Sequence, residues 1–488
     1  MAVLKRKDRE WLHGRFGGRI VLGPMDVRPI AGPGIVLPTF FKLFLGRTAP
    51  LAVFSPRGES ELVELLSWAS GRKIPLFPRG KASSGSGAAV PTQKGIIVDF
   101  SEMRDIVAID ASAATAAVEP GITWKELNES LAPEGFTLRL HPAGRYFSSV
   151  GGWLAQGGVG LGSYEFGRLE ENIAGVRLVL PGGEVKELTG PDLALVAGAE
   201  GTTGLISRVT LRLQKLDEME HLAVAFSDSE GLAGFFADFL KEKLPVWSAA
   251  FLNGGMMELR NRTSLQSAPR DSGELEDAFA FNYAALLAFR KKDRAGLMPG
   301  LLRIAYKHRG TKLDDGISNR AAGILLKSQD FAVEPLARVP LEIVVPLERL
   351  GPALTRLAAG IKRLVIREGI IVPDGAGDKP EALILGHVSG DARRLSYHFV
   401  FSLILTAAKV AKKFGGRPYA TGLFFAHRAE QILGKERLRR LREFKIRVDS
   451  RDILNPNKVF EESLVGRGLS QVSALEPLFR FLANRARR

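Results

Sequence analysis

The stretch whose residue types are best suited to chemistry is residues 76–90, LFPRGKASSGSGAAV. An apolar run, Ile74–Phe77, stops at Pro78, and glycines and other small residues follow as far as Val90. Such small side chains cannot pack a core, and they leave backbone N–H groups free to converge on one anion. The stretch therefore predicts a cradle for a phosphate-bearing ligand, with a flexible Ser/Gly linker as the alternative.

Two further glycine-rich stretches support the cradle over the linker. Residues 141–167 carry two glycine pairs within HPAGRYFSSVGGWLAQGGVGLGSYEFG, and residues 197–213, AGAEGTTGLISRVTLRL, lead from a turn into an alternating strand. Each places a turn with little side chain at the end of a strand, where backbone can approach a large flat ligand closely.

The elements that must position these loops alternate between strand and helix. Residues 51–54 and 74–77 read as strands on either side of an amphipathic helix, so the first loop directly follows a β-α-β unit. Strands are expected at 95–100 and 105–110, and Thr123 with Glu126 forms a capping-box pattern for the next helix. Residues 1–49 show no lasting period, and we expect an irregular N-terminal extension that wraps the first domain.

Composition limits the function classes. The chain has 488 residues, no cysteine and a formal net charge of +15, which excludes disulfides and cysteine-ligated clusters and favours anionic ligands, an acidic partner or a membrane surface. No nucleic-acid-binding motif is present, so we expect no nucleic acid. Without a secretory signal or a spanning run, we expect a cytoplasmic protein, with peripheral contact to the membrane's inner face as an alternative. Residues 35–45 are apolar and fit either a segment packed on the protein's own core or a docking surface.

Four motifs occur in an order that resembles one flavoprotein family. Residues 78–91 (PRGKASSGSGAAVP), 148–158 (SSVGGWLAQGG), 200–213 (EGTTGLISRVTLRL) and 451–460 (RDILNPNKVF) resemble the vanillyl-alcohol oxidase / p-cresol methylhydroxylase family, most closely its glycolate oxidase subunit and D-lactate dehydrogenase branch. The resemblance implies an α+β fold: a two-subdomain FAD-binding domain and a cap domain with an antiparallel sheet. The expected organisation is an N-terminal extension (1–49), an FAD-binding domain (50–215), a cap (216–448) and a C-terminal segment that closes on the FAD domain (449–488).

The resemblance also implies how FAD is held. The first loop would wrap the pyrophosphate, although the family commonly has glycines where this chain has Lys81 and Ala82. The second loop would line the flavin and ribityl side, the third would lie near the adenine, and the C-terminal motif would close over the site. No histidine lies in the first loop, so we expect non-covalent FAD. The residues expected to bind it are Pro78, Arg79, Gly80, Lys81, Ala82, Ser83, Ser84, Gly85, Gly87, Pro142, Ser148, Ser149, Gly151, Gly152, Glu200, Gly201, Gly204, Ile206, Asn457 and Lys458.

The catalytic motif of the branch is altered in this chain. The family pattern GHxGDGNxH becomes GHVSGDARRLSYHF at residues 386–399, and the later EHG motif is missing, so we expect no bound metal. His387 and His398 are the candidate general bases, with Tyr397 beside them, although core histidines would fit the same pattern. Tyr419 and Arg417 could donate to a bound acid, because the fork of an arginine matches a carboxylate.

The function implied by the resemblance is oxidation of a 2-hydroxy acid or a related alcohol by hydride transfer to FAD. Since the chain has no cysteine, we expect electrons to leave to a partner protein of the iron–sulfur type. Two alternatives remain: a flavin-bearing subunit that relays electrons within a larger complex, and an oxidase that uses oxygen.

Overall fold

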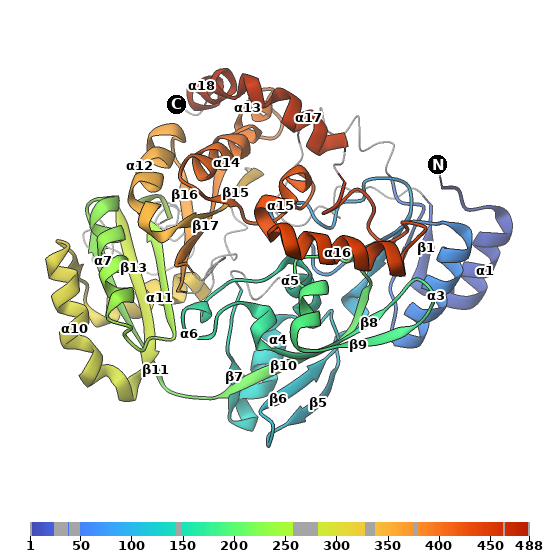
Figure 1. Ribbon diagram of the computed structural model, residues 1–488, viewed down its shortest axis with the longest axis horizontal. Helices are drawn as coiled ribbons and strands as arrows, with labels where there is room; N and C mark the ends of the chain where they lie inside the picture. The colour runs from blue at the N-terminus through green and yellow to red at the C-terminus, as the bar shows by residue number, and fades with distance from the viewer. Residues whose placement is uncertain are drawn as a thin grey trace.

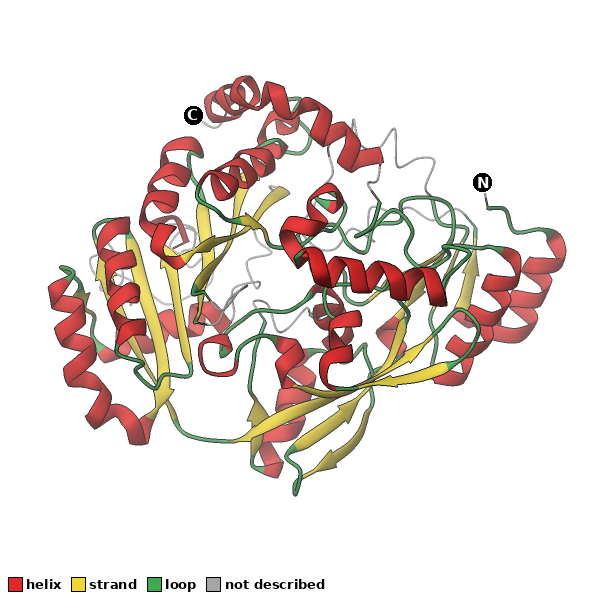
Figure 2. Cartoon of the chain, viewed as in Figure 1, coloured by secondary structure: helices red, strands yellow, loops and turns green. Residues whose placement is uncertain are grey.

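A computed structural model describes residues 2–23, 38, 49–142, 148–256, 282–326, 337–373, 379–461 and 464–486. Figures 1 and 2 show three β-sheets with helices packed around them, which agrees with the predicted α+β class. The first two sheets lie on one side of the molecule and the third, larger sheet lies on the other. Residues 35–45, except Pro38, lie outside the described residues, so both predicted roles of this segment stay predictions.

The first sheet supports the first glycine loop. Its order is β1 (Ile20–Leu22), β2 (Ala52–Phe54), β4 (Ile96–Asp99) and β3 (Leu76–Arg79), with β2, β4 and β3 mutually parallel. Helix α3 (Glu59–Arg72) connects β2 to β3, and the apolar side of this helix, predicted from the sequence, is buried. We expect an irregular N-terminus from the sequence, but the structure shows regular elements there. Helix α1 (Arg6–Phe16) and strand β1 pack on the first sheet, and Phe16 contacts Phe54 at a ring-centroid distance of 4.3 Å.

The second sheet carries the other two glycine loops. Its order is β5 (Ile106–Asp110), β6 (Thr115–Val118), β10 (Leu205–Lys215), β8 (Ile173–Val179) and β9 (Val185–Leu188), and β7 (Phe136–Leu138) pairs with the far end of β10. The capping box predicted at Thr123 is present, and it begins α4 (Trp124–Leu131). Helix α5 (Val150–Gln156) follows Ser149 and packs on the same core. The chain then leaves this sheet between Lys215 and Met219.

The third sheet is the antiparallel cap sheet. Its eight strands are ordered β14 (Thr311–Lys312), β11 (Met219–Phe226), β13 (Tyr283–Arg290), β12 (Ser248–Asn253), β16 (Val365–Val372), β17 (Glu381–Gly390), β15 (Ala337–Pro346) and β18 (Arg417–Pro418). Helix α12 (Leu350–Gly360) ends at Gly360, and residues 365–372 form the central strand β16. The run of β-branched residues from Val365 onward favours a strand there.

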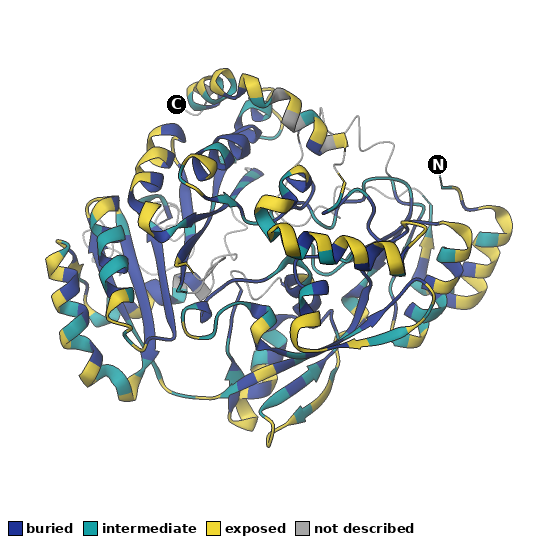
Figure 3. Ribbon diagram, viewed as in Figure 1, coloured by how far each residue is buried: buried dark blue, intermediate teal, exposed yellow. Residues whose placement is uncertain are grey.

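The two faces of the cap sheet have different surroundings. One face is covered by helices, as the dark buried strands in Figure 3 indicate, and packs against α7 (Ser229–Lys241), α10 (Arg294–Lys307), α12 (Leu350–Gly360) and α14 (Leu403–Lys413). The other face carries Leu383 and Leu385 and packs against Val159 and Leu161 of the FAD-binding domain and against α11 (Asp315–Leu326). This second face therefore looks toward the predicted flavin.

The C-terminal part of the chain visits both domains. Helix α16 (Lys435–Val448) places Leu441 and Phe444 in the core of the second sheet, and Leu454 forms a parallel bridge with Leu76 at the edge of the first sheet. We expected the whole segment 449–488 to close on the FAD domain. After residue 461, however, α17 (Leu464–Val472) leads into α18 (Glu476–Ala486), which packs on α14 and α13 (Tyr397–Phe401) of the cap.

Candidate cofactor site and the adjoining cavity

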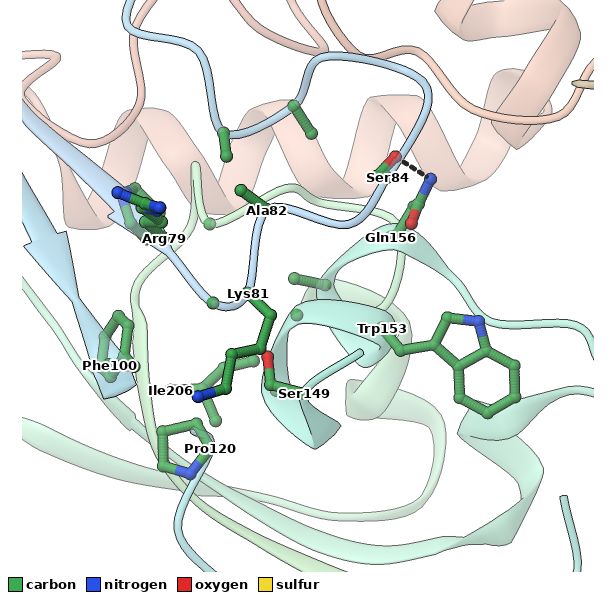
Figure 4. A pocket seen from close by; sticks show the side chains of 18 of the residues that line it. Arg79, Lys81, Ala82, Ser84, Phe100, Pro120, Ser149, Trp153, Gln156 and Ile206 are labelled. Carbon is green, nitrogen blue, oxygen red and sulfur yellow. Dashed lines mark hydrogen bonds between the residues drawn. The ribbon is translucent and has the colours of Figure 1, made fainter. Parts of the chain in front are cut away.

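A cavity of about 800 Å³, open to solvent, lies where the three glycine-rich stretches meet (Figure 4). Its walls are β3 and the loop after it, the start of α5 and the turn before β10. The predicted cofactor-binding residues that line it are Pro78, Arg79, Gly80, Lys81, Ala82, Ser83, Ser84, Ser148, Ser149, Gly151, Gly152, Glu200, Gly201, Gly204 and Ile206. Stretches more than a hundred residues apart in the sequence therefore form one site.

The remaining predicted residues lie behind or beside this cavity. Gly85 and Gly87 continue the loop away from it and contact Glu342 and Leu423 respectively. Pro142 is buried and directly precedes residues 143–147, which are outside the described part of the chain. Asn457 and Lys458 do not line the cavity either; they contact Thr92 and Gly87. The C-terminal motif therefore supports the loop from behind.

The residues that line the cavity fit a large polar ligand with phosphates. Three buried polar atoms on its lining have no protein partner: Arg79 Nε, Ser149 Oγ and one oxygen of Glu200. Lys81 adds a cation, and in Figure 4 its side chain lies beside Ser149. Cationic side chains and unpaired donors suit a pyrophosphate, and the small lining residues leave room for it.

Glycine is required at one point of this wall. Gly201 has a φ of +71°, and a Cβ there would lie 2.4 Å from Pro78 Cγ, so a side chain would push against the wall of the cavity. The loop also departs from the family pattern at Ala82, which adopts a φ of +51° without being glycine. The departure noted in the sequence therefore places a strained alanine in a left-handed conformation.

Eight lining residues were not predicted: Ala88, Ala89, Phe100, Pro120, Trp153, Ala155, Gln156 and Leu205. Ala155 and Gln156 follow the predicted Gly151-Gly152 pair by one helical turn, so helical spacing could have indicated them. Gln156 donates to the Ser84 hydroxyl at 2.6 Å, a contact that joins α5 to the first loop (Figure 4). Phe100 and Pro120 come from turns that carry no binding motif, and no sequence signal singled them out.

Lys458 is a buried cation rather than a surface lysine. Its side chain is 1% exposed and its ammonium donates to the Gly87 carbonyl at 2.9 Å. Burial lowers the pKa of Lys458 to about 8, and the carboxylate of Glu200 acts in the opposite direction. The structure thus places the ammonium of Lys458 behind the glycine loop. The sequence resemblance instead predicts that this residue closes over the flavin.

A second cavity, with about 620 Å³ of space, adjoins the first and shares Gln156 and Glu200 with it. It lies between the FAD-binding domain and the cap sheet, and several of its polar residues are charged. Arg417 holds Glu381 with both nitrogens of its fork, and Arg168 reaches the same carboxylate at 3.4 Å. Tyr419 also lines this cavity, and its hydroxyl accepts a hydrogen bond from the Val159 N–H at 2.9 Å. Two residues that we considered as donors to an acid, Arg417 and Tyr419, are thus brought together here.

Two glutamates on the cap sheet were missed by the sequence analysis. Glu342 and Glu368 both pair in register with Leu385, so their side chains share the face that looks toward the FAD-binding domain. Both oxygens of Glu368 are buried without a partner, and burial raises its pKa to about 7 although Arg367 opposes the shift. Burial likewise raises the pKa of Glu342, which accepts from the Gly85 N–H. No motif marks these positions; only the strand register brings them to the site.

The three predicted catalytic residues do not come together. His387 is buried on the same sheet face as Leu385, because residues two apart in a strand share a face. Tyr397 instead packs against Gly390 in the helix-covered core, where burial raises its pKa. His398 is partly exposed on α13, with Nδ1 3.0 Å from the Leu395 carbonyl. Tyr397 and His398 thus lie on the opposite side of the sheet from His387, because the chain turns away into α13 after β17.

Within the described residues, no group of three or more acidic or histidine side chains is arranged to hold a metal ion. In the same part of the chain, no helix combines the length and apolar character needed to cross a bilayer.

Sequence comparisons agree with the cavity. Residues 50–189 match the FAD binding domain family. The chain is 26% identical over 432 residues to a mitochondrial D-lactate dehydrogenase [cytochrome] of Arabidopsis thaliana, a match that covers 84% of this chain and 73% of that protein. It is 23% identical to a D-lactate dehydrogenase of Archaeoglobus fulgidus, over 83% of this chain and 90% of the relative. The match to the glycolate oxidase subunit GlcD of Bacillus subtilis is 26% identical but spans only 42% of this chain and 46% of that subunit.

Solved structures share the fold. A p-cresol methylhydroxylase structure superimposes with a TM-score of 0.73 at 16% identity, over 94% of this chain and 98% of that one. An alkyldihydroxyacetonephosphate synthase gives a TM-score of 0.71 at 18% identity, over 93% and 84%. The domain match, the relatives and the fold agree with the residues that line the cavity, and FAD is the cofactor. Residues 50–189 therefore form an FAD binding domain, and the chain is an FAD-dependent oxidoreductase that is similar in sequence to D-lactate dehydrogenases and a glycolate oxidase subunit and in fold to p-cresol methylhydroxylase.

Proposed function

We propose that this enzyme oxidises a 2-hydroxy acid or a related alcohol bound in the second cavity. The observation that carries the proposal is the junction of the two cavities at Gln156 and Glu200, which gives a ligand in the second cavity access to the cofactor site. FAD supplies the hydride acceptor when it is bound. The names of the relatives, D-lactate dehydrogenase and glycolate oxidase subunit, support a hydroxy acid as the substrate class.

The residues of the second cavity would hold and orient such a substrate. The guanidinium of Arg417 is fixed by the carboxylate of Glu381, so it is held in place before a substrate arrives. Arg168, from the FAD-binding domain, brings a second cation to the same carboxylate. Tyr419 receives a hydrogen bond from Val159 and keeps its own hydroxyl proton to donate. Two cations and a hydroxyl donor suit the carboxylate of an acid.

The proton released from a substrate hydroxyl needs an acceptor. His387 remains the candidate from the catalytic motif, because its side chain shares a sheet face with Leu385 and so looks toward the FAD-binding domain. Tyr397 and His398, on the other side of the sheet, have no role in this proposal. The histidine would act as a general base, whose usual contribution to rate is about 10²–10⁴-fold.

The electrons are proposed to leave to a partner protein of the iron–sulfur type, since a chain without cysteine cannot hold such a cluster through thiolates. The proposed location is the cytoplasm. Binding of nucleic acid is not part of the proposal, because no motif in the sequence supports it.

The test is anaerobic reduction of the bound flavin, followed by the loss of its visible absorbance, with a panel of D- and L-2-hydroxy acids and the matching alcohols. Bleaching by a hydroxy acid, with a higher half-saturating concentration in the Arg417→Lys variant, is the expected result. Arg437→Lys is the matched control, because Arg437 lines the same cavity but pairs with Glu170 rather than with Glu381. No bleaching by any acid would remove the substrate class. Bleaching only in the presence of co-purified partners would favour the electron-relay alternative, and steady peroxide production in air would favour an oxidase.

A further inference from the structure

The C-terminal helices present an apolar surface that neither cavity uses. Leu478 and Phe481 on α18 are 54% and 60% exposed, and Leu395, just before α13, is 83% exposed. Leu464 and Leu475, on and after α17, are also more than half exposed. Figure 1 shows α13, α17 and α18 at one edge of the molecule, and in Figure 3 the outer sides of α17 and α18 are largely exposed. These five side chains define what we call the C-terminal apolar face.

The spacing of residues on α18 explains why this face is not simply a poorly packed core. Phe479 packs on Phe399 at a ring-centroid distance of 5.7 Å, and Ala483 is fully buried, so the inner side of α18 is well anchored to the cap. Leu478 and Phe481 lie three residues apart on the outer side, and Arg485 follows one turn later. The helix is therefore held firmly with a second apolar stripe turned outward.

Exposed arginines border this face. Arg393 and Arg394 flank Leu395 with side chains 82% and 76% exposed, and Arg485 is exposed at the end of α18. Two nearby carboxylates are turned inward: the side chain of Asp391, which pairs with Arg393 and Arg394, is 17% exposed, and that of Glu476 is 4% exposed. Glu461, three residues before Leu464, is exposed. Leucine and phenylalanine bordered by arginines on the surface of a helix form the pattern of a helix that lies in a membrane interface.

Other basic side chains among the described residues are paired with carboxylates. Lys291 and Lys292 bind Glu218 and Asp217, and Lys307 binds Asp238, so these cations are matched by neighbouring carboxylates. Arg393 and Arg394 are paired too, with Asp391, so the C-terminal apolar face is distinguished by its apolar side chains: it holds five of the twelve exposed large apolar side chains of the described residues.

We propose that the C-terminal apolar face docks on the surface of a bilayer that contains anionic lipids. Leu478, Phe481 and Leu395 would enter the acyl boundary while the arginines contact lipid phosphates. An anionic bilayer fits because exposed arginines border the face and its five apolar side chains are each more than half exposed. This attachment would bring the enzyme to a membrane that no described helix crosses. It is independent of the proposed substrate.

The test is sedimentation of the FAD-loaded full-length chain with vesicles of phosphatidylcholine alone or mixed with phosphatidylglycerol. Wild-type protein is expected to sediment with the mixed vesicles. The Leu478→Glu/Phe481→Glu variant should bind them at least about tenfold more weakly, because it loses both apolar insertion and charge complementarity. The matched control is Tyr306→Glu/Ile446→Glu. It makes the same change in net charge at two apolar side chains, 63% and 65% exposed, on α10 and α16, and should bind as the wild type does.

The control separates docking from the general attraction of a +15 protein to anionic lipid. Equal weakening in both double variants would overturn the proposal, as would failure of the wild type to bind mixed vesicles. A Leu478→Ala/Phe481→Ala variant keeps the charge and tests insertion alone; undiminished binding by it would also contradict the proposal. If the glutamate variant instead loses a co-purifying protein while its vesicle binding is unchanged, the face is a protein interface and the proposal is wrong. Retained flavin absorbance shows in each case that the variant is folded.

Discussion

The carboxylate of Glu200 joins the two domains by accepting a hydrogen bond from the Thr421 hydroxyl at 2.7 Å. The same oxygen accepts from the Gly422 N–H, while the second oxygen has no protein partner. Since Glu200 lines both cavities, this contact fixes the wall that they share. The wall therefore depends on a residue from the FAD-binding domain and on one that follows β18 of the cap.

Replacing Thr421 by valine is expected to lower stability by about 1–3 kcal/mol, because it removes one donor from a buried carboxylate. It should also weaken FAD binding, since Glu200 is no longer held. Urea unfolding and titration of the apoprotein with FAD measure the two effects. Thr137→Val removes a hydroxyl that donates to Asn128, far from the cavities, and should affect stability alone. Equal FAD affinity in both variants would show that the contact does not shape the site.

Gly201→Ala is expected to weaken FAD binding at least about tenfold, because its Cβ would displace Pro78 and a left-handed φ disfavours alanine. Gly182→Ala is the control, since a Cβ at Gly182 meets no atom within 4 Å. Fluorescence titration with FAD measures both. If Gly201→Ala keeps normal affinity for FAD, Pro78 can move aside without distorting the cavity, and the prediction is wrong.

Glu368→Gln is expected to change how stability depends on pH. The folded pKa of Glu368, about 7, lies above its ordinary value of 4.5, so the folded state binds the proton more tightly. The resulting stabilisation is complete below about pH 4.5 and is lost as the pH rises through 7. The wild type should therefore lose up to about 3 kcal/mol relative to the glutamine variant over this range. Chemical unfolding of the wild type and of Glu368→Gln across this range tests the prediction; a difference between the two that stays flat with pH would contradict the assigned shift.

Acid denaturation is expected to release the flavin into solution, because no histidine lies in the first loop to attach it. The measurement is the visible absorbance of the supernatant after precipitation. Yellow colour that stays with the precipitate would show a covalent bond and would direct attention to His141, which is buried at the start of the second loop.

The glycine-rich stretches were predictable because their function requires consecutive small residues directly after a strand, and such a pattern is local in the sequence. Fifteen of the residues chosen from them line one cavity. The catalytic assignment relied instead on a linear motif, and linear spacing does not tell on which side of a sheet a side chain falls. A turn after Gly390 was enough to carry Tyr397 and His398 away from His387.

Glu342 and Glu368 illustrate the converse. They are 26 positions apart in the sequence and come to lie on either side of Leu385 only because β15 and β16 both pair with β17. The register of these strands depends on long-range packing, so it cannot be predicted from a local sequence pattern. Lys458 was identified by its motif, but its position behind Gly87 depends on how the C-terminal segment meets the loop.

The bridge between Leu76 and Leu454 has a consequence for how the protein is made. Strand β3 carries the first glycine loop and lies at the edge of its sheet until residues 453–455 arrive. During synthesis, the ribosome must therefore translate nearly four hundred further codons before the strand beneath the loop gains its last neighbour. We expect nascent chains that end before this segment to capture FAD poorly, so loading of the cofactor would be a late event that follows translation of the whole cap.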